Sequence, residues 1–163
     1  MNTVPIDDLE YELRMLLGAA KQCQLFDEHD IGNPINYAKD SIYLHARNLY
    51  NFFSANTAND ARVTKFTSHQ FNLTFYGIWI DALHNHASHI KESRRTPTNV
   101  VNGDHLKDQV QKFASDIEGL WTDWINHTTD PQLKTRLKDA LKSARQEAQD
   151  DYDSLKKRIV PAS

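Results

Sequence analysis

The chain has 163 residues, a formal net charge of -3 at pH 7 and a hydrophobic fraction of 39%, values typical of one globular domain with a sizeable core. Five glycines and five prolines are few turn-forming residues for this length, which argues against a fold of many short strands. There is no run of about 18 apolar residues and only one cysteine, Cys23, so we expect a cytoplasmic protein that has no internal disulfide and does not enter a membrane.

The first half of the chain has the apolar spacing of three helices. Apolar residues recur at three- and four-residue steps from Ile6 to about Gln24 and predict a first helix there. Asn33-Pro34, a capping residue followed by proline, predicts the start of a second helix that continues to about Ser54. Aromatic and β-branched residues from Val63 towards Arg95 predict a third helix, although residues 71–80 are also compatible with a strand.

Two further helices are predicted in the second half. Asp104 is the expected cap of a fourth helix, whose apolar stripe extends from Leu106 to Trp124. Thr129-Asp130-Pro131 repeats the signal of a cap followed by proline and opens a fifth helix, with an apolar face from Leu133 to Leu155. Because these helices must bury their stripes against one another, the sequence predicts an all-α fold. We expect an antiparallel (up-down) bundle of four to five helices, formed by a single domain over residues 1–163.

Arg62 and His69 are the first candidates for catalysis. On a continuous helix, residues seven positions apart lie on the same face, about 10.5 Å apart along the axis. An arginine can hold a phosphate through two hydrogen bonds and a histidine can transfer a proton near neutral pH, so the pair suits phosphoryl chemistry. The alternative is an exposed arginine and a half-buried or capping histidine without a catalytic role.

The other histidines of interest fall into two groups. His45 lies on the apolar stripe of the second helix, so we expect it to be buried and hydrogen-bonded, either fixing helix packing or supporting a polar site between helices. His84, His86 and His89 form a histidine-rich segment in which His86 and His89 can share a helix face and bind a metal ion. Their spacing matches no known zinc-binding helix, and we therefore expect a solvated face and no metal.

The last predicted helix carries a local excess of basic residues: Lys134, Arg136, Lys138, Lys142 and Arg145. Acidic residues of the same helix, from Asp139 to Asp153, dilute this excess. We therefore interpret the basic residues as keeping this helix soluble, and not as a nucleic-acid-binding surface.

Two motifs together resemble the HEPN superfamily of small helical-bundle proteins. They are Leu44-His45-Ala46-Arg47-Asn48-Leu49-Tyr50-Asn51-Phe52-Phe53 and, after a short polar loop, Arg62-Val63-Thr64-Lys65 with His69 following. The chain is similar in particular to bacterial members with a His-x-Arg-x-Leu-x-x-Phe-Phe helix and an Arg-x6-His element, over roughly residues 35–70. The resemblance implies metal-independent RNA cleavage by a cytoplasmic homodimer that needs no cofactor. It also implies a role in a toxin–antitoxin or abortive-infection system, with an antitoxin protein as a further partner.

By this resemblance, Arg62 and His69 are the catalytic residues. His69 would act as general acid or base on the ribose 2′-hydroxyl or the leaving oxygen, and Arg62 would stabilise charge on the phosphate. His45, Arg47 and Lys65 would support the site, the last two by adding positive charge to a cleft of the dimer.

Two other classes of function stay open. One is a binding or regulatory module that keeps the helical bundle and has no catalytic activity. The other is a metal-dependent bundle similar to the DinB-like hydrolases, to which His45 would contribute one ligand.

Overall fold

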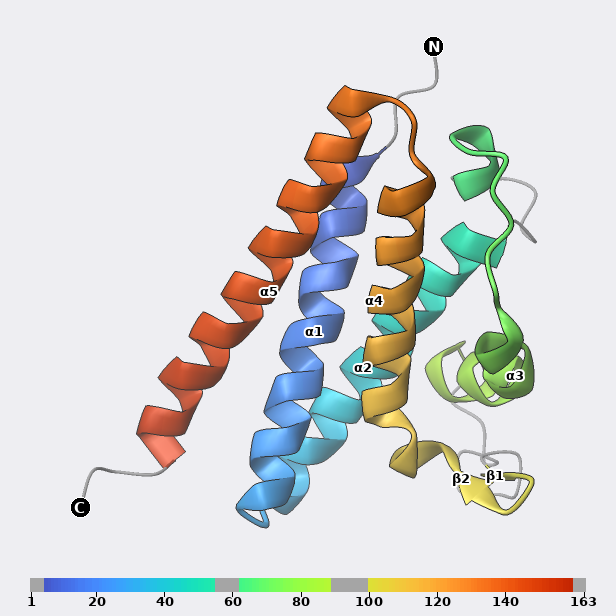
Figure 1. Ribbon diagram of the computed structural model, residues 1–163. Helices are drawn as coiled ribbons and strands as arrows, with labels where there is room; N and C mark the ends of the chain where they lie inside the picture. The colour runs from blue at the N-terminus through green and yellow to red at the C-terminus, as the bar shows by residue number, and fades with distance from the viewer. Residues whose placement is uncertain (1–4, 55–61, 89–99, 160–163) are drawn as a thin grey trace.

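The computed structural model describes residues 5–54, 62–88 and 100–159 of the protein (Figure 1). Five α-helices account for most of these residues, which confirms the predicted all-α bundle. Their bounds are α1 Ile6–Glu28, α2 Gly32–Ser54, α3 Thr74–Ser88, α4 Val110–His127 and α5 Pro131–Ile159. The remaining elements are the short 3-10 helices η1 (Val63–Lys65) and η4 (Leu106–Asp108) and the strands β1 (Val100–Val101) and β2 (Asp104–His105).

Helix α1 packs against both α2 and α5, and these two neighbours run in opposite directions (Figure 1). Arg14 of α1 bonds to Glu147 of α5 at 2.7 Å, and Lys21 bonds to Gln149 at 2.8 Å. Since residue numbers increase together along the two helices, α5 lies parallel to α1. Consecutive helices α1 and α2, and likewise α4 and α5, are antiparallel (Figure 1).

Helices α2 and α4 are also parallel, because the chain returns along the bundle before α4 begins. Tyr50 contacts Asp116, and the Phe52 ring lies 5.2 Å from that of Trp124, so the numbering again increases together. The return path is the non-helical segment 66–73, which descends from η1 to α3 beside the bundle (Figure 1). A bundle of this topology therefore places residues of the return segment against α4.

The predicted helix from Val63 was wrong over its first eleven residues. Arg62 is extended (φ -130°, ψ 140°), η1 is a single turn, and the next helix begins only at Thr74. The start is set locally by Asn72, whose Oδ1 accepts hydrogen bonds from the Thr74 backbone N–H at 3.1 Å and hydroxyl at 2.7 Å. This asparagine gives the chain a turn in place of a continued helix. The far end of the prediction, from 89 to 95, lies outside the described residues.

Asp104 does not cap α4, contrary to the sequence prediction. It lies in β2, which pairs with β1 in a two-residue hairpin, Val101 opposite Asp104. Asn102 and Gly103 form the turn, both with positive φ (52° and 89°), and an Asn-Gly pair is the preferred sequence for such a turn. Helix α4 therefore starts later, after Gln109.

The other predicted boundaries lie closer to the observed ones. The first helix extends to Glu28, four residues past the expected end, and α2 begins at Gly32, just before Asn33-Pro34. The predicted cap of the last helix is confirmed, because Asp130 Oδ1 accepts hydrogen bonds from the N–H groups of Gln132 at 2.9 Å and Leu133 at 3.3 Å.

The core lies where α1, α2 and α4 meet, and its largest side chains are aromatic. Trp121 and Trp124 of α4 are fully buried, and Phe52 and Phe53 of α2 pack against the Trp124 ring. Phe53 also contacts Phe71 of the return segment, with ring centres 5.0 Å apart. The aromatic core thus extends outward to anchor the segment that carries His69.

Tyr50 and Asp116 form a polar contact inside this core. The fully buried Tyr50 donates its hydroxyl to Asp116 Oδ2 at 2.6 Å, and its ring stacks on that of Tyr76 at 4.5 Å. Burial raises the pKa of the Asp116 carboxyl above its ordinary value, and the hydrogen bond from Tyr50 opposes this shift. Burial also raises the pKa of Tyr50, so the phenol keeps its proton and remains the donor.

These shifts predict a specific pH dependence of stability. A carboxyl with a raised folded-state pKa stabilises the fold most below the ordinary aspartate pKa of about 3.9, and that contribution is lost as pH rises through the raised value. Because asparagine does not titrate, the unfolding free energy of Asp116→Asn should decrease less than that of the wild type as pH rises through the raised pKa of Asp116. Tyr50→Phe should extend the decrease to higher pH and cost about 1–3 kcal/mol at pH 7. Urea unfolding of the three proteins from pH 4 to pH 8 tests this, and parallel curves for wild type and Asp116→Asn would contradict it.

Candidate active site

His69, Asp123 and His127 meet at the surface near the C-terminal end of α4. His69 Nε2 lies 2.6 Å from Asp123 Oδ2, while His127 Nδ1 lies 3.1 Å from Oδ1 of the same carboxylate and 2.9 Å from the Asp123 backbone oxygen. The two imidazole rings are stacked, with centres 3.6 Å apart and planes 7° from parallel. Two imidazoles therefore share one carboxylate.

Two parts of the chain hold the three side chains of this cluster. Asp123 and His127 are four residues apart on α4, so they lie on one face of the helix. His69 belongs to the return segment, where its backbone N–H donates to Thr67 Oγ1 at 3.1 Å and its ring packs edge-on against Phe71 at 4.9 Å. Because Phe71 packs on the core, the position of His69 is fixed relative to α4.

The hydrogen bonds determine which ring nitrogens carry protons. Carboxylate and carbonyl oxygens only accept, so His69 Nε2 and His127 Nδ1 must be the donors. This leaves His69 Nδ1 and His127 Nε2, to which no other described residue forms a hydrogen bond. The His69 side chain is 23% exposed and that of His127 49% exposed, so both rings are in part open to solvent. A ring whose outward nitrogen is unprotonated can act as a base, and a ring that carries protons on both nitrogens can act as an acid.

The geometry suits proton transfer better than metal binding. One ligand atom from each of the three side chains lies within 4.8 Å of the others, which is close enough to consider a metal ion. However, an imidazole binds a metal in its ring plane, and two stacked parallel planes share no point at which an ion could sit. Ligand atoms in tetrahedral zinc coordination lie about 3.3 Å apart, whereas His69 Nε2 and Asp123 Oδ2 are 2.6 Å apart. A metal ion would require one ring to rotate.

The structure does not join Arg62 to His69. Arg62 is half-buried and extended at the start of η1, and no hydrogen bond links it to His69 within the described part of the chain. The helical spacing expected to place the two side chains on one face is absent, because η1 ends at Lys65. Lys65 itself is exposed.

His45 is buried and hydrogen-bonded, as predicted. Its side chain is 8% exposed, and Nδ1 lies 2.8 Å from Glu12 Oε2, which also accepts a hydrogen bond from Asn48 at 3.0 Å. Arg47 and Asn48 line a pocket of about 410 Å³ between α1 and α2, together with Asn51 and Glu12. His45 therefore both joins α1 to α2 and orients the polar wall of this pocket.

Asp123 and His127 are the site residues that the sequence interpretation missed. Their spacing, Asp-x-x-x-His on the cleanest amphipathic helix, was a usable signal for a shared helix face. The third member, His69, is 54 residues away along the chain from Asp123, and no local pattern connects them. Of the histidine-rich segment, His84 is exposed and lies 3.3 Å from the Tyr76 hydroxyl. The His86 side chain and His89 lie outside what is described.

No known protein family, curated protein or solved structure matches this chain. None of the helices in the described ranges combines the length and apolar character that crossing a bilayer requires.

Proposed function

We propose that the protein is a metal-independent ribonuclease of the HEPN-like kind, acting as a homodimer. The observation that carries the proposal is the pair of stacked imidazoles on Asp123. Cleavage of RNA at a ribose 2′-hydroxyl needs one group to remove a proton and another to supply one, and the two histidines present both within one small site.

The chemistry assigns a separate role to each ring. His69 Nδ1 removes the proton of the 2′-hydroxyl, whose oxygen attacks the adjacent phosphorus. The bond from phosphorus to the 5′-oxygen breaks, and His127, which must enter the step with protons on both ring nitrogens, gives the Nε2 proton to that leaving oxygen. The products are a 2′,3′-cyclic phosphate and a free 5′-hydroxyl. Asp123 stabilises the His69 imidazolium that forms, because its carboxylate accepts a hydrogen bond from the Nε2–H group at 2.6 Å.

The other parts of the proposal come from the resemblance to the HEPN superfamily. Arg62 stabilises charge on the phosphate, and Arg47 and Lys65 add positive charge to the RNA cleft. Because Arg62 and His69 are not joined within one chain, we propose that Arg62 reaches the site of a second copy in the homodimer. Toxicity controlled by an antitoxin protein is the corresponding biological role.

An assay of RNA cleavage in excess EDTA tests the activity. Wild-type protein should cut a single-stranded RNA, and His69→Ala should reduce the rate by about 10²–10⁴-fold, the usual contribution of a general acid or base. His105→Ala is the matched control, since His105 is exposed in β2, and it should retain wild-type activity.

Two results would contradict the proposal. Cleavage that disappears in EDTA would indicate a metal-dependent enzyme. Equal preservation of RNA by wild type and His69→Ala would leave the bundle a binding or regulatory module.

A further inference from the structure

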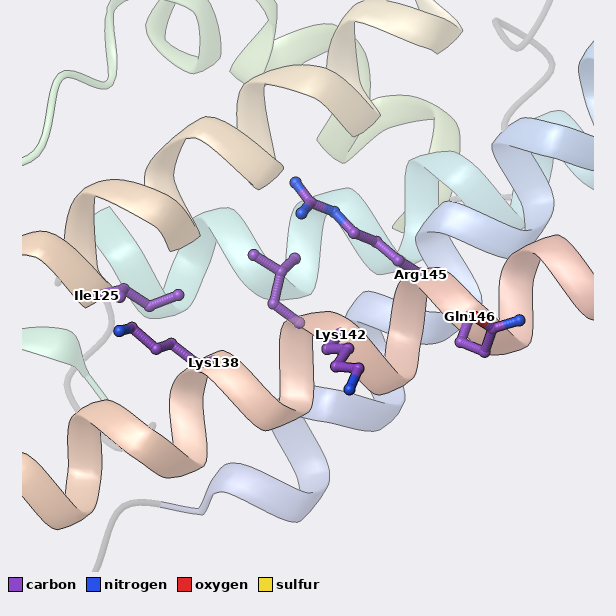
Figure 2. A pocket seen from close by; sticks show the side chains of 6 residues that line it. Ile125, Lys138, Lys142, Arg145 and Gln146 are labelled. Carbon is purple, nitrogen blue, oxygen red and sulfur yellow. The ribbon is translucent and has the colours of Figure 1, made fainter.

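A positively charged pocket lies between α4 and α5. Its volume is about 390 Å³, and we call it the α4–α5 groove (Figure 2). Ile125 of α4 and Lys138, Leu141, Lys142, Arg145 and Gln146 of α5 line it. Three of the five basic residues that the sequence interpretation assigned to solubility are thus gathered around one pocket.

The charge of the groove is opposite to that of the chain. The lining residues include three cations and no carboxylate, whereas the whole chain has a net charge of -3. Arg145 Nε donates to Glu118 Oε1 at 2.6 Å, which neutralises one of these cations. Lys138 and Lys142 are exposed, and neither forms an ion pair with a described residue. A local positive field on an acidic protein favours an anionic ligand.

The floor of the groove is apolar. Ile125 is 6% and Leu141 is 7% exposed, and the end of the Lys138 side chain lies beside Ile125 (Figure 2). Figure 2 shows Lys138 and Arg145 extending from α5 towards α4. A ligand that fits this arrangement has a negatively charged part for the lysines and a flat apolar part for the floor. A nucleotide of a single-stranded nucleic acid has both, and its bases pack on side chains without requiring a particular sequence.

The groove is also close to the candidate active site along α4. Ile125 lies between Asp123 and His127 in the sequence, so the two sites occupy different faces of the same helical turn. A strand that binds in the groove can therefore continue around the end of α4 towards the histidine pair.

We propose that the α4–α5 groove binds a nucleotide of the RNA that flanks the cleavage position, with phosphates at Lys138 and Lys142 and the base on Ile125 and Leu141. This inference rests on the proposed ribonuclease function and names where the substrate strand is held outside the catalytic residues.

Binding of an RNA that cannot be cut tests the groove separately from catalysis. The probe is a fluorescent single-stranded 2′-O-methyl oligonucleotide, which lacks the 2′-hydroxyl nucleophile, and the readout is anisotropy with full-length protein. The double variant Lys138→Ala, Lys142→Ala should weaken binding roughly tenfold at low salt. It should also reduce the slope of log K against log salt by about 1.4, or 0.7 for each phosphate that a lysine no longer neutralises.

The double variant Lys156→Ala, Lys157→Ala is the matched control, because it removes the same charge from exposed positions on the same helix. Equal weakening by both double variants would overturn the inference, as would tighter binding of a glutamate polymer than of the RNA. If the probe binds through the groove but RNA is never cleaved, the proposed function fails and the groove assignment stands. If RNA is cleaved and the groove variant binds normally, only the groove assignment fails.

Discussion

Asp123→Asn is expected to reduce the rate of RNA cleavage by about 10²–10⁴-fold while leaving the fold intact. One carboxylate oxygen accepts a hydrogen bond from His69 at 2.6 Å, and the other lies 3.1 Å from His127 Nδ1. An amide in its place has one acceptor oxygen and presents an N–H group to the other ring, so one imidazole must turn or change its protonated nitrogen. In related acid–base sites the same substitution lowers kcat by about 10⁴ through the wrong tautomer.

In the proposed mechanism Asp123 acts through the histidines and does not contact RNA, so the effect of its substitution should fall on kcat. We expect KM for RNA to stay within about twofold of the wild-type value. Thermal unfolding should shift little, because the Asp123 side chain is 37% exposed. Asp151→Asn, an equivalent change at an exposed position of α5, is the control. A kcat within threefold of wild type for Asp123→Asn would show that the carboxylate has no role in catalysis.

The helices that the sequence predicted best are those with strong local signals. In α2 and α5 the apolar residues recur at helical spacing over many turns, α2 begins within a residue of Asn33-Pro34, and Asp130-Pro131 marks the start of α5 by a cap that the structure confirms. His45 could also be placed from its position on an apolar stripe. Such features depend on residues a few positions apart, which is the range over which helical geometry acts.

The errors arose where contacts distant in sequence decide the conformation. The aromatic residues of segment 66–73 predicted a helix, yet Phe71 packs on Phe53 and the segment follows a non-helical path. This non-helical return explains why Arg62 and His69 lose their expected spacing. It also brings His69 to Asp123 and His127, a meeting that depends on the parallel placement of α2 and α4.

The α4–α5 groove illustrates the same limit for charge. In the sequence, basic and acidic residues are mixed along α5, a pattern typical of a helix exposed to solvent. In the fold, Glu147 faces Arg14 of α1, while Lys138 and Arg145 extend towards α4 (Figure 2). Charges that are mixed along the chain are therefore separated in space by the two sides of one helix.

Trp121→Ala is expected to cause the largest loss of stability among the substitutions considered, about 3–5 kcal/mol. The side chain is fully buried, its indole N–H donates to the Leu137 backbone oxygen at 3.0 Å, and its ring packs edge-on against Trp124 at 5.6 Å. This contact is a buried link between α4 and α5, the two helices that line the groove. Since domains of this size have about 5–15 kcal/mol of stability, such a loss would approach global unfolding.

Trp121→Phe separates the two parts of this contact. Phenylalanine keeps an aromatic ring against Trp124 and loses the hydrogen bond to Leu137, so we expect a smaller cost of about 1–3 kcal/mol. Tyr37→Ala is the control, because its side chain is 76% exposed and removal should change stability by about 0.5 kcal/mol or less. Urea unfolding followed by circular dichroism measures all three. A loss below about 1 kcal/mol for Trp121→Ala would contradict this prediction and show that the packing of α5 on the bundle does not depend on the Trp121 contact.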